Sequence, residues 1–367
     1  MRALGLDVQI DAIGNVVATR HGTDPTLAPV MTGSHIDTVR TGGRFDGNLG
    51  VLAGLEVIET LIQHDVRTPR GVQVAFFTDE EGARFAPDML GSLVYVGGLA
   101  LEEALDARAA DDGVRLGDEL TRIGYAGPTP CPAGSAPHAF VELHIEQGPV
   151  LEDEGTTIGV VTGVQGISWT ELTITGTSAH AGTTPMHLRH DPLVAAAQIA
   201  LDVHQIAAAI GSGQVATVGR FDPFPDLVNV VAQRVTMTVD LRNTDEGLLR
   251  RAEAMLAASI ERAVAVQRCT VETRSLARFE PVAFDAGMIE RVETTAARLG
   301  HSARRMPSGA GHDAQMLARV CPTSMIFVPS VGGLSHNIAE FTEPHHIAAG
   351  ADVLLHVILA AAGTTEM

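Results

Sequence analysis

Histidines and carboxylates recur in this sequence close to the ends of apolar segments. In GSHIDT, His35 and Asp37 are two residues apart, so an extended chain turns both side chains to one face. That spacing suits a metal ligand and the carboxylate that orients it, although such a pair is more often structural. Asp46 in GRFDGNLG lies between small residues at the point where a helix is expected to begin. It fits either a carboxylate that bridges two cations or a helix N-cap.

The segment FFTDEEG is more informative, because Asp79, Glu80 and Glu81 come directly after the apolar run GVQVAFFT. The carboxyl ends of parallel strands are where α/β proteins place their sites. Three adjacent carboxylates beside a buried strand repel one another unless a cation compensates, and a solvated turn is the alternative. With a metal bound, one glutamate can ligate while its neighbour takes a proton from the attacking water.

Two further apolar runs end in histidine. HAFVELHIEQG carries His144 and Glu146 on one face, and FVPSVGGLSHNIAEF delivers His336 after a glycine-rich turn. A core residue is the usual explanation for a single histidine such as His144 in an apolar run, and each element alone leaves both interpretations equally open. Four strand ends bearing imidazoles and carboxylates together indicate a site for a divalent metal, which prefers these ligands.

The middle of the chain adds polar residues of another kind. His180 lies in the small-residue loop GTSAHAGTTPM, where it could donate to a developing oxyanion. Asn229 and Arg242 lie on expected strands, and an arginine fork suits a substrate carboxylate. An ordinary salt bridge between Arg242 and Asp240 is an equally good interpretation.

The element pattern predicts two domains. Residues 1–165 and 280–367 alternate apolar runs with amphipathic helices, which is typical of an α/β domain with a mainly parallel sheet. Residues 166–279 follow a βαββαβ order, which predicts an inserted ferredoxin-like domain. We expect helices at 192–210 and 246–266, and a single strand over 228–243.

Composition narrows the class of protein. The 367 residues carry a formal net charge of −19, and the basic residues are scattered, so we expect no nucleic-acid partner. No apolar run approaches the ~20 residues of a membrane span, and the first residues lack an apolar signal core; we therefore expect a cytoplasmic protein without a membrane partner. The cysteines, Cys131, Cys269 and Cys321, are isolated and are interpreted as buried or incidental thiols.

The order of these motifs resembles the M20 family of dinuclear metallohydrolases, and within it the hydantoinase/carbamoylase amidase branch. GSHIDT, FDGNLGV, TDEEGARF, LHIEQGPVLE, GTSAHAGTTPM, PSGAGHDA and FVPSVGGLSHN follow in the family's order over essentially the whole chain. LHIEQG and SGAGHDA point to the amidase branch. Relatives carry a further helical segment before the first strand, and none of the matched metal or base positions lies in that segment.

The resemblance implies a role for each matched residue. Asp46 would bridge two divalent ions, Zn²⁺ above all, with Mn²⁺, Co²⁺ or Ni²⁺ possible. His35 and His144 would complete one metal site, and Glu81 and His336 the other. Glu80 would be the general base and Asp37 would orient His35. The positions that hold substrate in this branch are Gln147, His180, Asn229, Arg242, Ser308, Gly309 and Ala310.

The resemblance also implies hydrolysis of a linear amide or ureido bond in a small carboxylate-bearing substrate, with N-carbamoyl-L-amino acids first and N-carbamoyl-β-alanine close to them. Allantoate is the main alternative, and an aminoacylase or dipeptidase is a weaker one. A metal-binding interaction module without catalysis is the alternative from another class, but a purely structural site has no need of Glu80. The inserted domain would form a homodimer interface and close over the site.

Overall fold

The computed structural model describes residues 1–364 and divides into two compact units. The first unit contains residues 1–163 and the chain from Ala283 onward, and the inserted unit is Val164–Val282. The inserted unit therefore begins two residues earlier, and ends three residues later, than the sequence pattern predicts. Each unit has its own sheet and is described by itself.

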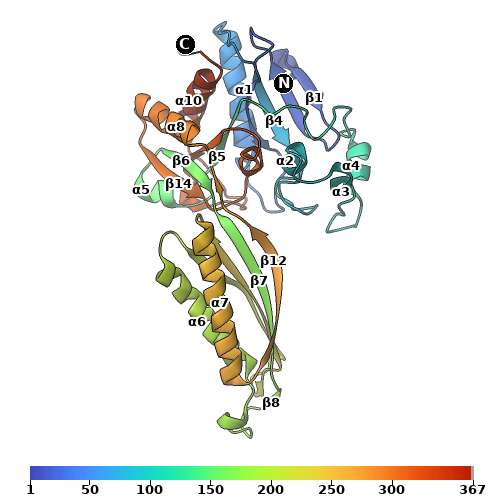
Figure 1. Cartoon of the computed structure of the whole chain (residues 1–367), viewed down its shortest axis with the longest axis vertical. Helices are drawn as coiled ribbons and strands as arrows, with labels where there is room; N and C mark the ends of the chain where they lie inside the picture. Colours follow the sequence, from blue (N-terminus) through green and yellow to red (C-terminus); the bar gives the residue numbers. More distant parts are fainter. Residues whose placement is uncertain (365–367) are drawn as a thin grey trace. The chain divides into compact units, whose positions relative to one another are not determined.

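The sheet of the first unit is parallel at its centre and antiparallel on both sides, which confirms the predicted α/β class (Figure 1). The strand order is β1-β2-β4-β3-β5-β15-β6-β13, with β14 also paired to β6. The parallel strands are β4 (Val72–Phe77), β3 (Val30–His35), β5 (Ala139–Ile145) and β15 (Thr323–Val328). The others are β1 (Asp7–Ile10), β2 (Val16–Arg20), β6 (Ile158–Val164), β13 (Val282–Ala283) and β14 (Ala303–Ser308).

Three of the four parallel strands, β3, β5 and β15, are buried along their whole length because helices cover the sheet. The long helices of this unit, α1, α8 and α10, pack on the sheet, while the short α2 and α9 pack together beside β4 and β5. The helices are α1 (Asn48–Gln63), α2 (Leu90–Tyr95), α3 (Leu101–Leu105), α4 (Leu116–Ile123), α5 (Val150–Glu154), α8 (Ala286–Arg298), α9 (Asp313–Leu317) and α10 (Pro344–Ala361). Short 3₁₀ turns are η1 (Arg2–Leu4) and η3 (Val331–Gly333) here, and η2 (Met186–Leu188) in the inserted unit.

The inserted unit is a four-stranded antiparallel sheet of order β12-β7-β11-β9 packed on two helices. Its elements follow the βαββαβ order, as the pattern predicts: β7 (Gly166–Thr175), α6 (Pro192–Ile210), β9 (Val215–Phe224), β11 (Arg234–Asn243), α7 (Glu246–Gln267) and β12 (Thr270–Phe279). The single strand expected over 228–243 is wrong. The chain changes partner there, since β10 (Val230–Val231) pairs with β8 (Ala179–His180) before β11 joins the sheet.

Two helices are long and apolar enough to cross a membrane by length and composition alone, namely α6 and α10. Half of the apolar window of α10 is buried in the core of its unit, but only 28% of that of α6 is buried. The outer face of α6 exposes Leu193, Val194 and Leu201. All three cysteines are free thiols, and Cys269 is only partly buried.

The contact between α1 and the sheet leaves no room for a side chain at Gly50. A Cβ atom there would lie 2.5 Å from the carbonyl oxygen of Leu143 and 2.9 Å from Cβ of Ser34. Alanine improves helix propensity by about 1 kcal/mol, but overpacking costs about 1–3 kcal/mol, and a backbone oxygen cannot retreat without moving β5. The packing effect therefore dominates.

We predict that Gly50→Ala lowers the free energy of unfolding by about 1–2 kcal/mol, measured by urea denaturation. Gly117→Ala on helix α4 is the control, since a Cβ atom there would lie 3.3 Å from its nearest neighbour, the carbonyl oxygen of Leu105 on α3. That control should lose less stability than Gly50→Ala, because the helix-propensity gain of about 1 kcal/mol is opposed there by a looser contact. Equal stability of the two variants would contradict the tight contact of α1 with β5.

Candidate metal centre

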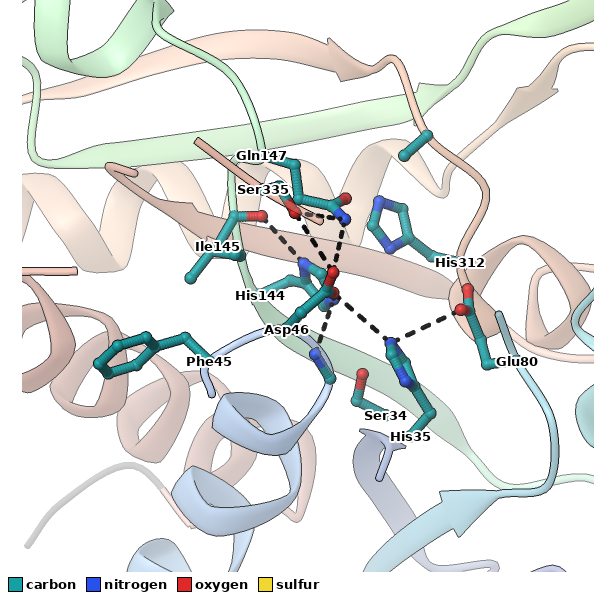
Figure 2. A network of polar contacts seen from close by, with 12 residues as sticks. Ser34, His35, Phe45, Asp46, Glu80, His144, Ile145, Gln147, His312 and Ser335 are labelled. Carbon is teal, nitrogen blue, oxygen red and sulfur yellow. Dashed lines mark hydrogen bonds and ion pairs between the residues drawn. The ribbon is translucent and has the colours of Figure 1, made fainter. Parts of the chain in front are cut away.

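The four parallel strands deliver the predicted ligands to one edge of the sheet. His35 is the last residue of β3, His144 lies near the end of β5, Glu81 follows β4, and His336 follows β15. Because β4, β3, β5 and β15 are successive neighbours in the sheet, these ends lie next to one another. Figure 2 shows His35 and His144 converging on Asp46, which comes from the turn before α1.

Asp46 lies at the centre of this cluster, with its side chain only 1% exposed. Its Oδ1 atom is 3.2 Å from Nε2 of His144 and 3.7 Å from Nε2 of His35. Its Oδ2 atom is 3.5 Å from Nε2 of His336. The alternative of a helix N-cap is wrong for this residue, because Gly47 is the N-cap of α1 and no side chain caps it.

Two overlapping sets of ligand atoms share Asp46. His35, Asp46 and His144 form one set, and Asp46, Glu81 and His336 the other; within each set the ligand atoms lie within 4.8 Å of one another. Oδ1 of Asp46 and Oε1 of Glu81 are buried and receive no hydrogen bond of ordinary geometry from the described residues. Buried oxygens are normally satisfied, so these atoms and their imidazole neighbours suit divalent metal ions.

Main-chain carbonyl groups orient the imidazole rings of His144 and His35. Nδ1 of His144 lies 2.9 Å from the carbonyl oxygen of Ile145, and Nδ1 of His35 lies 3.1 Å from that of Asp37. A carbonyl only accepts, so in each neutral ring Nδ1 carries the proton and donates it. The other nitrogen, Nε2, is then left with its lone pair toward Asp46, which is the tautomer that a metal ligand needs.

The charges of the cluster depend on one another. Burial alone would raise the pKa of Asp46, yet the imidazoles of His144, His35 and His336 hold it below its usual range. Burial opposes the charged form of His144, but Asp46 raises its pKa to about 9. The hydrogen bond and charge of Glu81 raise the pKa of His336. Without a cation, protons on His144 and His336 balance part of the carboxylate charge.

Glu80 belongs to neither set of ligand atoms. It is buried, and its Oε2 atom is 3.5 Å from Nε2 of His35. Burial, followed by the charges of Asp313 and Glu81, raises its pKa well above the usual range. A carboxylate in this position can accept a proton and return it.

The carboxylate of Asp37 makes its hydrogen bonds to the main chain and an ion-pair contact to His35, so its expected orienting of His35 stays a prediction. Its carboxylate accepts the backbone N–H groups of Glu80 at 3.2 Å and Glu81 at 3.1 Å. The Oδ1 atom stands 3.6 Å from Nδ1 of His35, whose hydrogen bond goes instead to the main-chain carbonyl of Asp37. The Asp37 side chain thus holds the turn that carries the two glutamates.

The predicted substrate residues of the first unit lie around this cluster. Gln147 donates from Nε2 to Oδ2 of Asp46 at 3.1 Å. The Ser308 hydroxyl accepts from the backbone N–H of Ala310 at 3.1 Å and lies 2.8 Å from Nε2 of His312. The ring of His312 in turn meets the ring of His144 edge-on, with centroids 4.6 Å apart. Gly309 completes the same turn.

The other three predicted substrate residues lie in the inserted unit. His180 on β8 and Asn229 beside β10 are brought together, since the carbonyl of Asn229 accepts the backbone N–H of Ala181 at 2.9 Å. Arg242 on β11 donates to Asp240 at 2.9 Å, and its guanidinium lies 5.8 Å from the centroid of the Trp169 ring. The salt bridge expected as the alternative for Arg242 is therefore present.

Several polar residues at the cluster were missed from the sequence, four of them buried and one, Ser335, partly buried. They are Glu142, His312, Asp313, Ser335 and Glu340. His312 and Asp313 stand in the PSGAGHDA motif, which was a signal for them. Glu142 accepts from the Ser34 hydroxyl at 2.6 Å and from the Ala314 N–H at 2.9 Å, and no periodicity distinguishes it from the apolar residues of β5.

We predict that metal uptake by this centre releases protons. Because the pKa of His144 is raised to about 9 in the metal-free protein, the ring is protonated at neutral pH and must lose its proton to ligate. Affinity for Zn²⁺ should therefore rise with pH up to about 9. Calorimetric titration at pH 7.5 in buffers of different ionisation enthalpy should show release of about one proton or more per chain. Heats independent of the buffer would contradict this.

Comparison with known proteins agrees with this geometry. The family model for peptidase family M20/M25/M40 matches residues 31–360. The chain is 45% identical over 366 residues to the N-carbamoyl-L-amino-acid amidohydrolase of Rhizobium meliloti, covering 99% of this chain and 86% of that protein. It is 36% identical over 355 residues to the allantoate amidohydrolase of Escherichia coli, covering 96% and 86% respectively.

Among solved structures, the hydantoinase/carbamoylase family amidase of Burkholderia multivorans is similar with a TM-score of 0.96 and 46% identity, covering all of this chain and 88% of that one. The sequence motifs, the strand-end cluster and these matches agree. The chain belongs to the M20 family of peptidases and amidohydrolases.

Proposed function

We propose that this chain is a metal-dependent amidohydrolase that converts N-carbamoyl-L-amino acids and water to amino acid, carbon dioxide and ammonia. The observation that carries the proposal is the pair of ligand sets joined by Asp46, beside a separate buried Glu80. The similarity to amidohydrolases with this named activity, at 45%, 40% and 38% identity, supports the choice of substrate.

In this proposal one divalent ion is held by His35, Asp46 and His144, and a second by Asp46, Glu81 and His336. When bound, such ions supply Lewis acidity at the substrate carbonyl and lower the pKa of water. The Glu80 carboxylate takes a proton from the attacking water and returns it to the leaving nitrogen. The raised pKa of Glu80 favours its holding that proton between the two steps.

The remaining matched residues hold the substrate in this proposal. Arg242 binds the substrate carboxylate. That carboxylate must compete for the guanidinium group with Asp240, which already pairs with it. His180 polarises the carbonyl group of the substrate. The backbone N–H of Gly182 donates to Nδ1 of His180 at 3.0 Å, and this hydrogen bond orients the ring. The other contacts would come from Gln147, Asn229, Ser308, Gly309 and Ala310.

An assay of ammonia release tests the substrate directly. Metal-reconstituted protein is given N-carbamoyl-L-amino acids, N-carbamoyl-β-alanine and allantoate in parallel, with a dipeptide and an N-acyl-amino acid followed by amine release. We expect kcat/KM to be highest for an N-carbamoyl-L-amino acid. If allantoate is turned over fastest, allantoate is the substrate instead. If only the dipeptide or the N-acyl-amino acid is turned over, the proposal of an N-carbamoyl substrate is overturned.

We predict that Glu80→Gln lowers kcat by about 10³-fold, since a general base contributes about 10²–10⁴-fold, while the content of bound metal stays unchanged. Glu146→Gln is the control, because this buried carboxylate at a neighbouring strand end already accepts two N–H groups, from Val150 and Leu151. Its kcat should stay within about threefold of the parent. Full activity of Glu80→Gln would show that another group moves the proton.

A homodimer through the inserted unit is part of the proposal, together with a cytoplasmic location. Helix α6 turns Leu193, Val194 and Leu201 to solvent, with exposed fractions of 39%, 46% and 62%. Strand β9 lies at the edge of the four-stranded sheet, so its outer N–H and C=O groups can pair with another strand. A second copy that covers both features by two-fold symmetry would bury them.

We predict that Leu201→Glu converts the dimer to a monomer, because a charge at the centre of an apolar interface is costly. Light scattering coupled to size-exclusion chromatography gives the mass. Leu52→Glu is the matched control, since Leu52 is 64% exposed on α1 of the first unit. A parent protein that is monomeric, or a Leu201→Glu variant that stays dimeric, would exclude this interface.

A further inference from the structure

We propose that Glu340 is a positioning residue for the metal centre, which ties the loop of Asp46 to the loop of His336. The inference rests on the proposed two-metal site and adds a residue that neither ligates nor moves a proton. Glu340 lies four residues after His336 and is buried, with 4% of its surface exposed.

The carboxylate of Glu340 fixes the main chain of the bridging residue. Its Oε1 atom accepts the backbone N–H of Phe45 at 3.0 Å and that of Asp46 at 3.1 Å. These two donors precede α1 and are far from Glu340 in sequence. Because a charged acceptor binds N–H groups more strongly than a neutral one, this contact orients the residue that both ligand sets share.

The second oxygen of Glu340 reaches the side chain of Asp46 through one hydroxyl. Oγ of Ser335 lies 3.2 Å from Oε2 of Glu340 and 3.3 Å from Oδ2 of Asp46. Gln147 donates from Nε2 to the same Oγ at 3.3 Å and to Oδ2 of Asp46 at 3.1 Å. Ser335 therefore stands between two buried carboxylates and directly precedes His336.

The surrounding chain is built closely around Glu340. A Cβ atom at Gly43 would lie 2.2 Å from Oε1 of Glu340, so this approach requires glycine. The Thr41 hydroxyl donates to the carbonyl oxygen of His336 at 3.0 Å, and the ring of Phe45 meets that of Phe341 edge-on at 5.7 Å. The two loops are thus joined on both sides of the carboxylate.

The two ligand sets depend on this junction to different degrees. His35 and His144 lie on buried central strands, which hold them whatever happens to the loops. His336 lies on a loop, half exposed and with a φ of 53°, a strained backbone conformation for a histidine. Loss of Glu340 should therefore weaken the set of Asp46, Glu81 and His336 more than the set of His35, Asp46 and His144.

The test titrates Zn²⁺ into the metal-free full chain and counts bound ions after equilibrium dialysis. The parent should bind two ions. Glu340→Leu, which cannot accept hydrogen bonds, should weaken the second ion by at least about tenfold, as expected for two buried N–H groups left unsatisfied, and the first by less than about threefold. Glu340→Gln keeps an acceptor for both N–H groups and can donate to Ser335, so it should restore the second ion to within about threefold.

Asp11→Leu is the matched control. Asp11 is likewise buried and accepts two backbone N–H groups, those of Ile13 at 3.1 Å and Asn15 at 2.9 Å, but in the turn between β1 and β2. It should keep both ions within about threefold, because it loses similar hydrogen bonds away from the centre. Equal loss of the second ion in Asp11→Leu and Glu340→Leu would overturn the positioning role, as would two unweakened ions in Glu340→Leu.

Two further outcomes are informative. A parent that binds fewer than two ions would overturn the two-metal centre itself, and the Glu340 inference with it. If Glu340→Leu does not fold, Ser335→Ala decides. It removes only the hydroxyl between the two carboxylates and should weaken the second ion by several-fold with the first unchanged. An unchanged second ion in Ser335→Ala would then overturn the inference.

Discussion

The carboxylate of Asp46, almost completely buried, faces three imidazole rings at 3.2 to 3.7 Å. An isolated charge in that position would be prohibitively costly, so the surrounding structure has to compensate it. The histidines lower the pKa of Asp46, and Asp46 raises that of His144 in return. Divalent cations can take the place of the protons on these histidines. The loops and strand ends around the cluster are arranged to hold the Asp46 carboxylate.

The parallel sheet makes the arrangement possible. Four neighbouring strands of the same direction bring their carboxyl ends to one edge, and each end contributes a ligand or a base. Helix α1 must approach β5 closely enough to bring Asp46 over that edge, which explains the absence of a side chain at Gly50. The close packing of α1 on β5 therefore also determines the position of the Asp46 carboxylate.

Carboxylates that bind no metal in the proposed centre hold the loops in place. Asp37 accepts the N–H groups of Glu80 and Glu81, and Glu340 accepts those of Phe45 and Asp46. In both cases an acidic side chain fixes the main chain of a proposed ligand or base. The centre therefore contains two groups of carboxylates: those proposed to bind metal or move a proton, and those that hold these residues in position. This division explains how so many carboxylates can be buried together in one unit.

The types and order of the chemical residues were readable from the sequence alone. Hydrophobic periodicity is local, so it placed His35, Glu80, Glu81, His144 and His336 at or after strand ends and predicted the α/β class and the inserted βαββαβ unit. The family came from another signal, the resemblance of the motifs in their order along the chain. Arg242 and Asp240, two residues apart on one strand, were also recognisable as a pair for the same reason.

Contacts between distant segments were decided only by the tertiary structure. Glu340 meets the N–H groups of Phe45 and Asp46 across 295 and 294 residues of chain, and no spacing announces that meeting. The same holds for Asp37, whose carboxylate accepts the Glu80 N–H from 43 residues away. Local pattern states which residues are available. The packing of strands and loops determines which of them meet, because hydrogen bonds depend on distances of a few tenths of an ångström that sequence separation does not encode.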